Sequence, residues 1–265
     1  MKVANKVIVV TGGANGIGRQ VVLEALRRGA RVAAVDISRP GLDETAGLAA
    51  AGDRLATFVA DITDREAIEA LPAQVTESLG APDGVVNVAG IIQPFVVMKD
   101  LDYDSIERVV NINLWGTIHV VKAFLPGLVE RPVAHLANVS SMGGFLPVPG
   151  QTIYGATKAA VKLMSEGLYA ELLETTVGVS VIMPGAVATE ITANSGVTIE
   201  AASAEGSSHS TTSAEEAGRI ILDGIEDDQL YIHVGRDSKM MSIFKRVAPK
   251  RATHLIQRQM KDLLT

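Results

Sequence analysis

The 265-residue chain has no cysteine, one tryptophan and few aromatic residues of any kind, which make up 4% of the sequence. The absence of cysteine excludes disulfides, thiolate nucleophiles and sulfur-ligated metals, and it suits a reducing compartment. The five histidines are scattered without an H-x-x-x-H or H-x-H pair, so we expect no metal site. No run of eighteen apolar residues occurs, and the N-terminal apolar run is too short for a signal peptide. We therefore expect no membrane span and a cytoplasmic protein.

Positive charge is scarce over most of the chain. The formal net charge of −6 argues against nucleic acid as the main partner. Residues 236–265 are the exception, because they carry eight Lys/Arg and two Asp, or +6, which leaves −12 for the remainder. Apolar and basic residues interleave there at near-helical spacing, and Pro249 interrupts the pattern. Such a basic amphipathic extension can contact a membrane peripherally, fold over a substrate pocket, cap an acidic body, or pack as a solvated helix.

Short β-branched runs alternate with amphipathic segments along the whole sequence. The strand-like runs are apolar throughout, as strands buried on both faces must be, and lie at 7–10, 31–36, 55–61, 84–90, 133–141, 179–184 and 230–234. The helical segments lie at about 16–28, 41–51, 64–79, 102–125, 152–176 and 213–227. This alternation predicts an α/β fold, a Rossmann-type doubly wound parallel sheet of about seven strands. We expect residues 1–265 to form a single domain.

Two further features bear on dynamics and assembly. Residues 192–213 are small and polar without a clear period, and a loop of that length in a compact domain is typical of a substrate lid or of a disordered segment. We interpret it as a substrate lid. The helices predicted at 102–125 and 152–176 have apolar faces too wide for one subunit's core. We expect them to pair in a homodimer or homotetramer.

The sequence T-G-G-A-N-G-I-G (11–18) follows the first predicted strand and opens the first helix. In that context Gly12 permits a tight turn, Gly16 lets the backbone approach a pyrophosphate, and Gly18 allows close helix–strand packing. Asp36 ends the second strand, where a carboxylate can accept hydrogen bonds from the adenosine ribose. A 2′-phosphate would meet a like charge there, so NAD is favoured over NADP. Arg39 lies close enough in sequence to keep NADP as the less favoured alternative.

Further motifs follow in a fixed order: A-D-I-T (60–63), N-V-A-G (87–90), N-I-N-L-W-G (111–116), S-S-M-G-G (140–144), Y-G-A-T-K (154–158) and P-G-A-V-A-T (184–189). From residue 5 to about 235 the chain resembles the short-chain dehydrogenase/reductase family, although Val88 replaces the second asparagine of the family's N-N-A-G. The resemblance implies an NAD-binding domain. The cofactor-binding residues it implies are Gly12, Asn15, Gly16, Ile17, Gly18, Asp36, Asp61, Ile62, Asn87, Ala89, Gly90, Tyr154, Lys158, Pro184, Gly185, Val187 and Thr189.

The same resemblance implies a catalytic set of Asn113, Ser141, Tyr154 and Lys158. Residues four apart stack on one helix face, so Tyr154 and Lys158 should point the same way. By the resemblance, Tyr154 exchanges a proton with the substrate, and Lys158 holds the ribose and lowers the tyrosine pKa from its usual value near 10. Ser141 binds the substrate oxygen. Asn113 disturbs its helix and anchors a water of a proton relay.

The segments that line the family's substrate pocket are apolar in this chain, at 91–98, 142–148 and 186–191. We expect the substrate residues to be Ser141, Phe145, Gln151 and Tyr154. Only Lys99 is basic nearby, so an apolar secondary alcohol or ketone fits better than an anion. Some family members that act on steroid-like or other lipid alcohols have similar C-terminal extensions, and by analogy the extension of this chain favours a lipid-like substrate.

Three other functions remain open. An NADP-dependent 3-oxoacyl or carbonyl reductase would need a different nucleotide preference from the one that Asp36 indicates. A catalytically silent dinucleotide-binding regulator is disfavoured by the intact catalytic set. An epimerase or dehydratase that uses bound NAD usually has a larger C-terminal substrate domain, and the 30 residues after Gly235 are too few for one.

Overall fold

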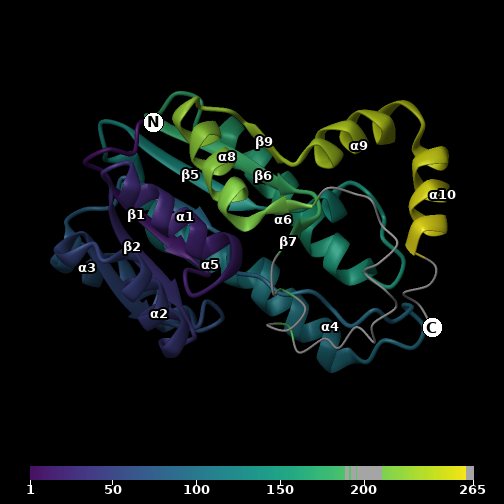
Figure 1. Ribbon diagram of the computed structural model, residues 1–265, viewed down its shortest axis with the longest axis horizontal. Helices are drawn as coiled ribbons and strands as arrows, with labels where there is room; N and C mark the ends of the chain where they lie inside the picture. The colour runs from purple at the N-terminus through teal and green to yellow at the C-terminus, as the bar shows by residue number, and fades with distance from the viewer. Residues whose placement is uncertain (189–190, 192–194, 196–210, 261–265) are drawn as a thin grey trace.

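The computed structural model describes residues 1–188, 191, 195 and 211–260, and a parallel sheet lies at its centre (Figure 1). The strands are β1 (Val7–Thr11), β2 (Arg31–Asp36), β3 (Leu55–Val59), β4 (Gly84–Asn87), β5 (Ala134–Val139), β6 (Val177–Pro184) and β9 (Tyr231–Val234). The seven run parallel in the order β3-β2-β1-β4-β5-β6-β9. This confirms the predicted doubly wound sheet. Its strand order reverses between β1 and β4, where sheets of this kind bind ligands.

Helices cover both faces of the sheet. They are α1 (Gly16–Arg27), α2 (Arg39–Ala49), α3 (Arg65–Leu79), α4 (Tyr103–Val110), α5 (Thr117–Val129), α6 (Thr152–Glu171), α8 (Ala214–Glu226), α9 (Arg236–Val247) and α10 (Pro249–Met260). Ile8 and Val10 of β1 pack with α1, α2 and α8, whereas Val7 and Val9 pack with α3 and α5. The continuous apolar runs in the sequence follow from this burial on two sides.

The helix predicted at 102–125 consists of three pieces. Between α4 and α5 lies η2 (Asn111–Gly116), a π-helical segment, and such segments often occur at functional sites. By length and composition alone, Tyr103–Val129 could cross a membrane, contrary to our expectation that no segment could. In this structure its inner side packs on the sheet through Val120, Phe124 and Leu128.

A second, two-stranded ladder was not predicted. It pairs β7 (Val187–Ala188) with β8 (Thr212–Ser213). Ser213 then caps α8 by accepting a hydrogen bond from the backbone N–H of Glu216. Most of the lid predicted at 192–213 lies outside the described residues. Within it, Ser195 is buried and accepts a hydrogen bond from the N–H of Ile92.

The basic extension forms two helices after β9, and Figure 1 shows them in yellow at the right of the molecule. The break expected at Pro249 is present: α9 ends at Val247 and α10 begins with the proline, whose missing N–H is tolerated at a first helical position. Met241, Ala252 and Ile256 pack on Leu146, so the extension lies against the loop that follows β5.

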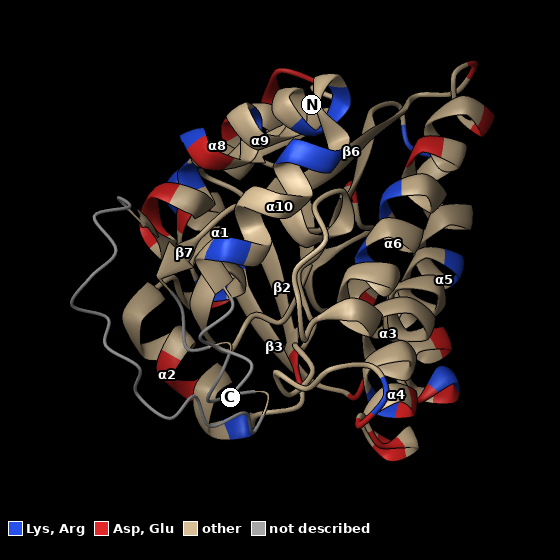
Figure 2. Cartoon of the chain, turned by 90° about the vertical axis from the view of Figure 1, so that its right-hand side faces the viewer, with Lys and Arg blue, Asp and Glu red and all other residues tan. Residues whose placement is uncertain are grey.

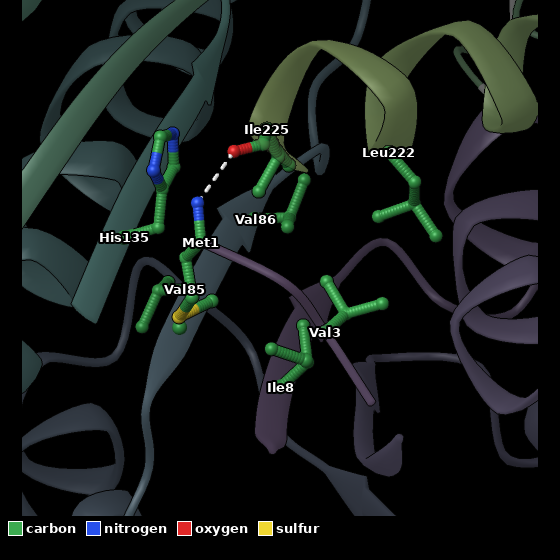
Figure 3. A pocket seen from close by; sticks show the side chains of 9 residues that line it. Met1, Val3, Ile8, Val85, Val86, His135, Leu222 and Ile225 are labelled. Carbon is green, nitrogen blue, oxygen red and sulfur yellow. Dashed lines mark hydrogen bonds between the residues drawn. The ribbon is translucent and has the colours of Figure 1, made fainter. Parts of the chain in front are cut away.

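The amino ends of the central strands are closed. A cavity of about 10 Å³ lies there, with room for at most one water, and it is lined by Met1, Val3, Ile8, Gly84, Val85, Val86, His135, Leu222 and Ile225. Figure 3 shows how the labelled side chains surround it. His135 is buried, with Nε2 2.8 Å from the Ser180 hydroxyl, and burial lowers its pKa to about 3. This cavity is too small to hold a substrate.

Candidate active site

The glycine loop (residues 11–18) joins β1 to α1. Its glycines let the backbone approach closely at positions where a side chain would collide with neighbouring backbone atoms. Gly12 has a φ of +73°, and a Cβ added there would lie 2.9 Å from the backbone nitrogen of Ala89. A Cβ on Gly18 would overlap the carbonyl oxygen of Gly12. Asn15 precedes α1 without a side-chain cap from the described residues, so the first N–H groups of the helix can bind a phosphate.

A cavity of about 640 Å³ opens at the carboxyl ends of the strands, beside this loop. Its walls contain most of the residues predicted to bind a cofactor, namely Gly12, Asn15, Gly16, Ile17, Gly18, Asp36, Asp61, Ile62, Ala89, Gly90, Tyr154, Lys158, Pro184, Gly185 and Val187. Asn87 does not line the cavity but is buried, with Nδ2 donating to Asn138 Oδ1 at 2.8 Å. Thr189 lies outside the described residues.

Asp36 lies between the glycine loop and the start of α2. Its Oδ2 accepts a hydrogen bond from the N–H of Ala14 at 3.1 Å, and its Oδ1 accepts one from the N–H of Ser38 at 3.0 Å. Arg39 is exposed and pairs with Asp43 along its own helix at 3.7 Å. Among the described residues lining the cavity, the basic ones are Arg108 and Lys158, and neither belongs to the segment around Asp36. This arrangement can hold ribose hydroxyls and offers no arginine clamp for a 2′-phosphate.

Tyr154 and Lys158 lie one turn apart on α6, both in the cavity wall. The Lys158 Nζ is 5.9 Å from the centre of the Tyr154 ring and donates to the carbonyl oxygen of Val139 at 3.0 Å. Burial lowers the pKa of Lys158 to about 8. Burial also raises the pKa of Tyr154, and a hydrogen bond with Ser141 opposes that rise. The lysine ammonium is directed to a backbone carbonyl, and the lowering of the tyrosine pKa that we expect from Lys158 together with a bound oxidised nicotinamide remains a prediction.

Ser141 follows β5 and also lines the cavity. Its hydroxyl oxygen accepts a hydrogen bond from the N–H of Gly143 at 3.0 Å, which fixes the side chain at the start of η3 (Met142–Gly144). The preceding Ser140 is buried and donates to the carbonyl oxygen of Lys158 at 2.7 Å. The end of β5 is thereby tied to the helix that carries the tyrosine and the lysine.

Asn113 lies in the π-helical segment and is completely buried. Its amide exchanges two hydrogen bonds with the backbone of Ile91, each 2.9 Å, and its Nδ2 lies 3.3 Å from the Thr157 hydroxyl. A Cβ on Gly90 would lie 3.1 Å from both Asn113 Oδ1 and Lys158 Nζ, so the glycine lets these groups approach. The predicted helix disturbance at Asn113 is present, while its water-anchoring role remains a prediction.

Sequence reasoning missed Gln93, which is fully buried in the loop after β4. Its Oε1 accepts hydrogen bonds from the N–H groups of Ile153 at 2.8 Å and Tyr154 at 2.9 Å, and its Nε2 donates to Gly150. These N–H groups belong to the first turn of α6, which no side chain from its own Ncap position satisfies. A signal was available: Gln151, rather than Ser, Thr, Asp or Asn, precedes the helix, so a cap had to come from elsewhere.

Two predicted substrate residues lie away from the cavity wall. Phe145 packs against the cluster formed with α9 and α10. Gln151 is buried and donates to the carbonyl oxygen of Gln93 at 2.7 Å, while its Oε1 has no partner among the described residues. The apolar side chains that line the cavity instead include Ile91, Ile92, Ile112, Val139 and Ile191.

The family model described as short chain dehydrogenase matches residues 6–199. The chain belongs to this family of oxidoreductases. Among its relatives, the putative oxidoreductase SadH of Mycobacterium tuberculosis is 32% identical over 91% of this chain and 90% of that protein. The 1-deoxy-11-beta-hydroxypentalenate dehydrogenase of Streptomyces avermitilis is 34% identical over 87% of this chain and 85% of that enzyme.

Solved structures agree on the fold of this short-chain dehydrogenase. A short-chain dehydrogenase/reductase from Burkholderia phymatum, in complex with NAD, superposes with a TM-score of 0.83 at 22% identity, covering 95% of this chain and 96% of its own. A short-chain dehydrogenase from Burkholderia cenocepacia, in complex with NADP, gives a TM-score of 0.81 at 24% identity, covering 97% and 99%.

Proposed function

We propose that this chain transfers a hydride between NAD(H) and a secondary alcohol or ketone that is apolar or lipid-like. One observation carries the proposal: a single cavity of about 640 Å³ is lined at once by the glycine loop, Asp36, Ser141, Tyr154 and Lys158. Family membership supports the reaction class.

The residues present fit a nicotinamide dinucleotide. The glycine loop, the uncapped start of α1 and the Asp36 carboxylate suit a pyrophosphate and an adenosine ribose. Of two proteins with this fold, one was solved with NAD and the other with NADP, so their structures leave the choice open. The negative charge of Asp36 and the pairing of Arg39 with Asp43 favour NAD. When bound, the nicotinamide supplies the hydride donor or acceptor.

The side chains around Tyr154 provide the proton chemistry. Because burial raises its pKa, Tyr154 is protonated at neutral pH and can donate to a ketone oxygen as the carbonyl carbon gains hydride. The alcohol then leaves with that proton, and the phenolate regains one from solvent. Oxidation runs through the same atoms in reverse. Ser141 orients the substrate oxygen by hydrogen bonding, and charged Lys158 stabilises the phenolate and holds the ribose.

The cavity wall supports an apolar substrate. Several isoleucine side chains line it, among them Ile91, Ile92 and Ile112. The guanidinium of Arg108 donates to the carbonyl oxygen of Ser195 at 3.2 Å. A carboxylate or phosphate ester would lack a free arginine clamp among the described lining residues. One relative is named as the dehydrogenase of a hydroxy compound, which supports a hydroxyl as the reacting group.

We also propose that the chain acts as one domain and assembles into a homodimer or homotetramer. Large apolar side chains are exposed on the α4–α5 and α6 side, and they include Tyr103, Trp115, Leu163, Tyr169 and Leu173. The Leu163 side chain, for example, is 70% exposed. Burying this surface between subunits would remove it from water. Light scattering of wild type and Leu163→Glu tests the assembly: the variant should dissociate, and a monomeric wild type at micromolar concentration would contradict it.

The direct test of function is a substrate panel. Secondary alcohols of increasing apolar size are supplied with NAD or with NADP, the matching ketones with the reduced nucleotides, and absorbance of the reduced cofactor is followed. We expect turnover with NAD that improves with apolar size. Nucleotide binding without turnover of any alcohol or ketone would favour the silent regulator instead, and efficient NADP-dependent reduction would favour a carbonyl or 3-oxoacyl reductase.

A further inference from the structure

The solvent-exposed side of α9 carries large apolar side chains, although a helix surface that faces water is usually polar. Met240 is 64% exposed, Ile243 is 59% exposed and Val247 is 80% exposed. Their spacing of three and four residues places them on one face of the helix. An exposed, contiguous apolar stripe of this kind indicates a contact surface.

Basic residues are frequent in α9, which carries this stripe, and in α10, which follows it. In residues 236–260 they are Arg236, Lys239, Lys245, Arg246, Lys250, Arg251 and Arg258. The same range contains one acidic residue, Asp237. Its carboxylate accepts a hydrogen bond from the backbone N–H of Ala186 at 2.8 Å. Figure 2 shows the basic bands on α10 in blue, with no red on that helix. Residues 236–260 therefore carry a formal charge of +6, seven basic less one acidic, although the chain as a whole carries −6. Two of the basic groups have partners within the fold, because Lys245 Nζ donates to the Thr253 hydroxyl at 3.1 Å and Arg246 lies near Glu166.

The inward side of the same helices explains why the outward side is not needed for folding. Met241 and Ile256 pack with the fully buried Leu146, and Phe244 joins this cluster. At the start of α9, Asp237 holds the segment around Ala186. Both contacts lie close in sequence to residues that line the cavity, since Leu146 is five positions after Ser141 and Ala186 comes directly after Gly185.

We propose that the outward face of α9–α10 docks on an anionic lipid bilayer. Met240, Ile243 and Val247 insert at the level of the headgroups, and the surrounding lysines and arginines contact lipid phosphates. A symmetric contact with a second copy of this chain is disfavoured, because a two-fold axis would place one basic face against another. The bilayer offers both the negative charge and the apolar layer that this face requires.

A consequence for the substrate rests on the proposed function. An apolar alcohol dissolved in the bilayer would be delivered beside the two segments that α9 contacts, Phe145–Val148 and Gly185–Ala186, and so beside the cavity. Docking itself does not depend on any activity. The two statements are therefore tested by separate measurements.

The experiment is flotation of the full chain with vesicles of phosphatidylcholine alone or mixed equally with phosphatidylglycerol. We expect wild type to bind the anionic vesicles at least about 100-fold more tightly than the neutral ones at low salt, and much less tightly at ~0.5 M salt. The apolar variant changes Met240→Ser, Ile243→Ser and Val247→Ser. The charge variant changes Lys239→Glu, Lys250→Glu and Arg251→Glu. Each should lose at least about 30-fold in affinity for anionic vesicles.

A matched control alters net charge equally on other surfaces, through Lys2→Glu, Arg65→Glu and Lys99→Glu, and should keep most of the binding. Circular dichroism confirms that each variant folds, and turnover of a small water-soluble alcohol without vesicles should stay normal in all of them. Normal small-alcohol turnover with no vesicle binding by wild type would overturn the docking and leave the proposed function intact. A change of oligomeric state in the α9 variants by light scattering, with unchanged vesicle binding, would assign the face to a second copy instead.

Discussion

Gln93 Oε1 lies 2.9 Å from the backbone nitrogen of Tyr154, so a residue of the loop after β4 caps the helix that carries the proposed acid. The same oxygen accepts from Ile153, and the Nε2 of Gln93 donates to Gly150, which fixes the orientation of the amide. The first turn of α6, and with it the position of Tyr154, depends on this buried side chain.

Replacing Gln93 should therefore slow turnover more than it weakens cofactor binding. Gln93→Leu leaves two buried N–H groups without an acceptor and should cost about 1–3 kcal/mol of stability. We expect kcat to fall roughly 10-fold or more while KM for NAD changes little, because a small displacement of the tyrosine harms the reacting geometry. Gln93→Glu keeps the acceptor and should recover part of kcat.

The control for Gln93 is another helix cap of similar energy. Asp64 caps α3 by accepting from the N–H of Ala67 at 3.1 Å, and α3 carries no cavity residue. Asp64→Ala should destabilise the fold by about 1 kcal/mol and leave kcat unchanged. Equal kcat losses in the two variants, at equal stability, would show that Gln93 acts through stability alone.

Nucleotide preference should follow the charge of Asp36. We expect kcat/KM for NAD to exceed that for NADP at least about tenfold, or 1.4 kcal/mol. Asp36→Asn keeps an oxygen that can accept from the N–H of Ala14 but removes the negative charge. It should therefore lower the ratio of kcat/KM for NAD to kcat/KM for NADP while preserving the conformation of the glycine loop. Asp53→Asn, in the exposed turn before β3, should leave the ratio as it is. Equal use of both nucleotides by wild type would sink the assignment.

Cofactor use should weaken in alkaline solution because burial lowers the pKa of Lys158 to about 8. Below that pH the ammonium is charged and can hold the ribose, and above it the charge is lost. We expect kcat/KM for NAD to decline as pH rises through about 8, as this ratio reports groups of the free enzyme. Lys158→Met should remove the decline along with most activity. A flat profile between about pH 7 and 9 in wild type would contradict this role.

Acid should destabilise the fold through His135. Burial, reinforced by the N-terminal charge, lowers its pKa to about 3 from the ordinary 6.5, so the folded state resists protonation. The stability it supports is complete above about pH 6.5 and is lost as pH falls towards 3, by roughly 2–3 kcal/mol at about pH 4.5. Urea unfolding at two pH values measures this loss.

The matched variants for that measurement are His135→Gln and His254→Gln. The first keeps a donor for Ser180 and should flatten the dependence on pH, whereas the second changes an exposed histidine and should not. Parallel losses of stability in wild type and His135→Gln would show that other groups govern acid sensitivity.

Strand positions were predictable because burial on both faces leaves a local mark, continuous β-branched runs such as Val7–Thr11. The glycine loop was predictable because its residues are adjacent in sequence and each has a steric reason. The disturbance of the helix at Asn113 was implied by the family resemblance, but the two hydrogen bonds between the Asn113 amide and the backbone of Ile91, 22 residues away, leave no local pattern in the sequence. Gln93 and Ser140 were missed for the same reason.

Side-chain direction and environment were the least predictable properties. Phe145 and Gln151 are near Ser141 and Tyr154 in sequence, yet one packs on the C-terminal helices and the other on Gln93. The sequence shows that Lys158 is one turn from Tyr154, but not that its ammonium donates to the carbonyl oxygen of Val139 or that burial raises the tyrosine pKa. Spacing indicates which face a residue shares, and only the packed structure shows what it contacts.

The measurement that tests the central claim most directly compares NAD binding and turnover in wild type and Tyr154→Phe. The substitution removes only the hydroxyl, so the fold and the nucleotide Kd should change less than about threefold while kcat for the best secondary alcohol falls about 100-fold or more. Near-normal turnover by Tyr154→Phe would contradict the account, because another group would then be moving the proton.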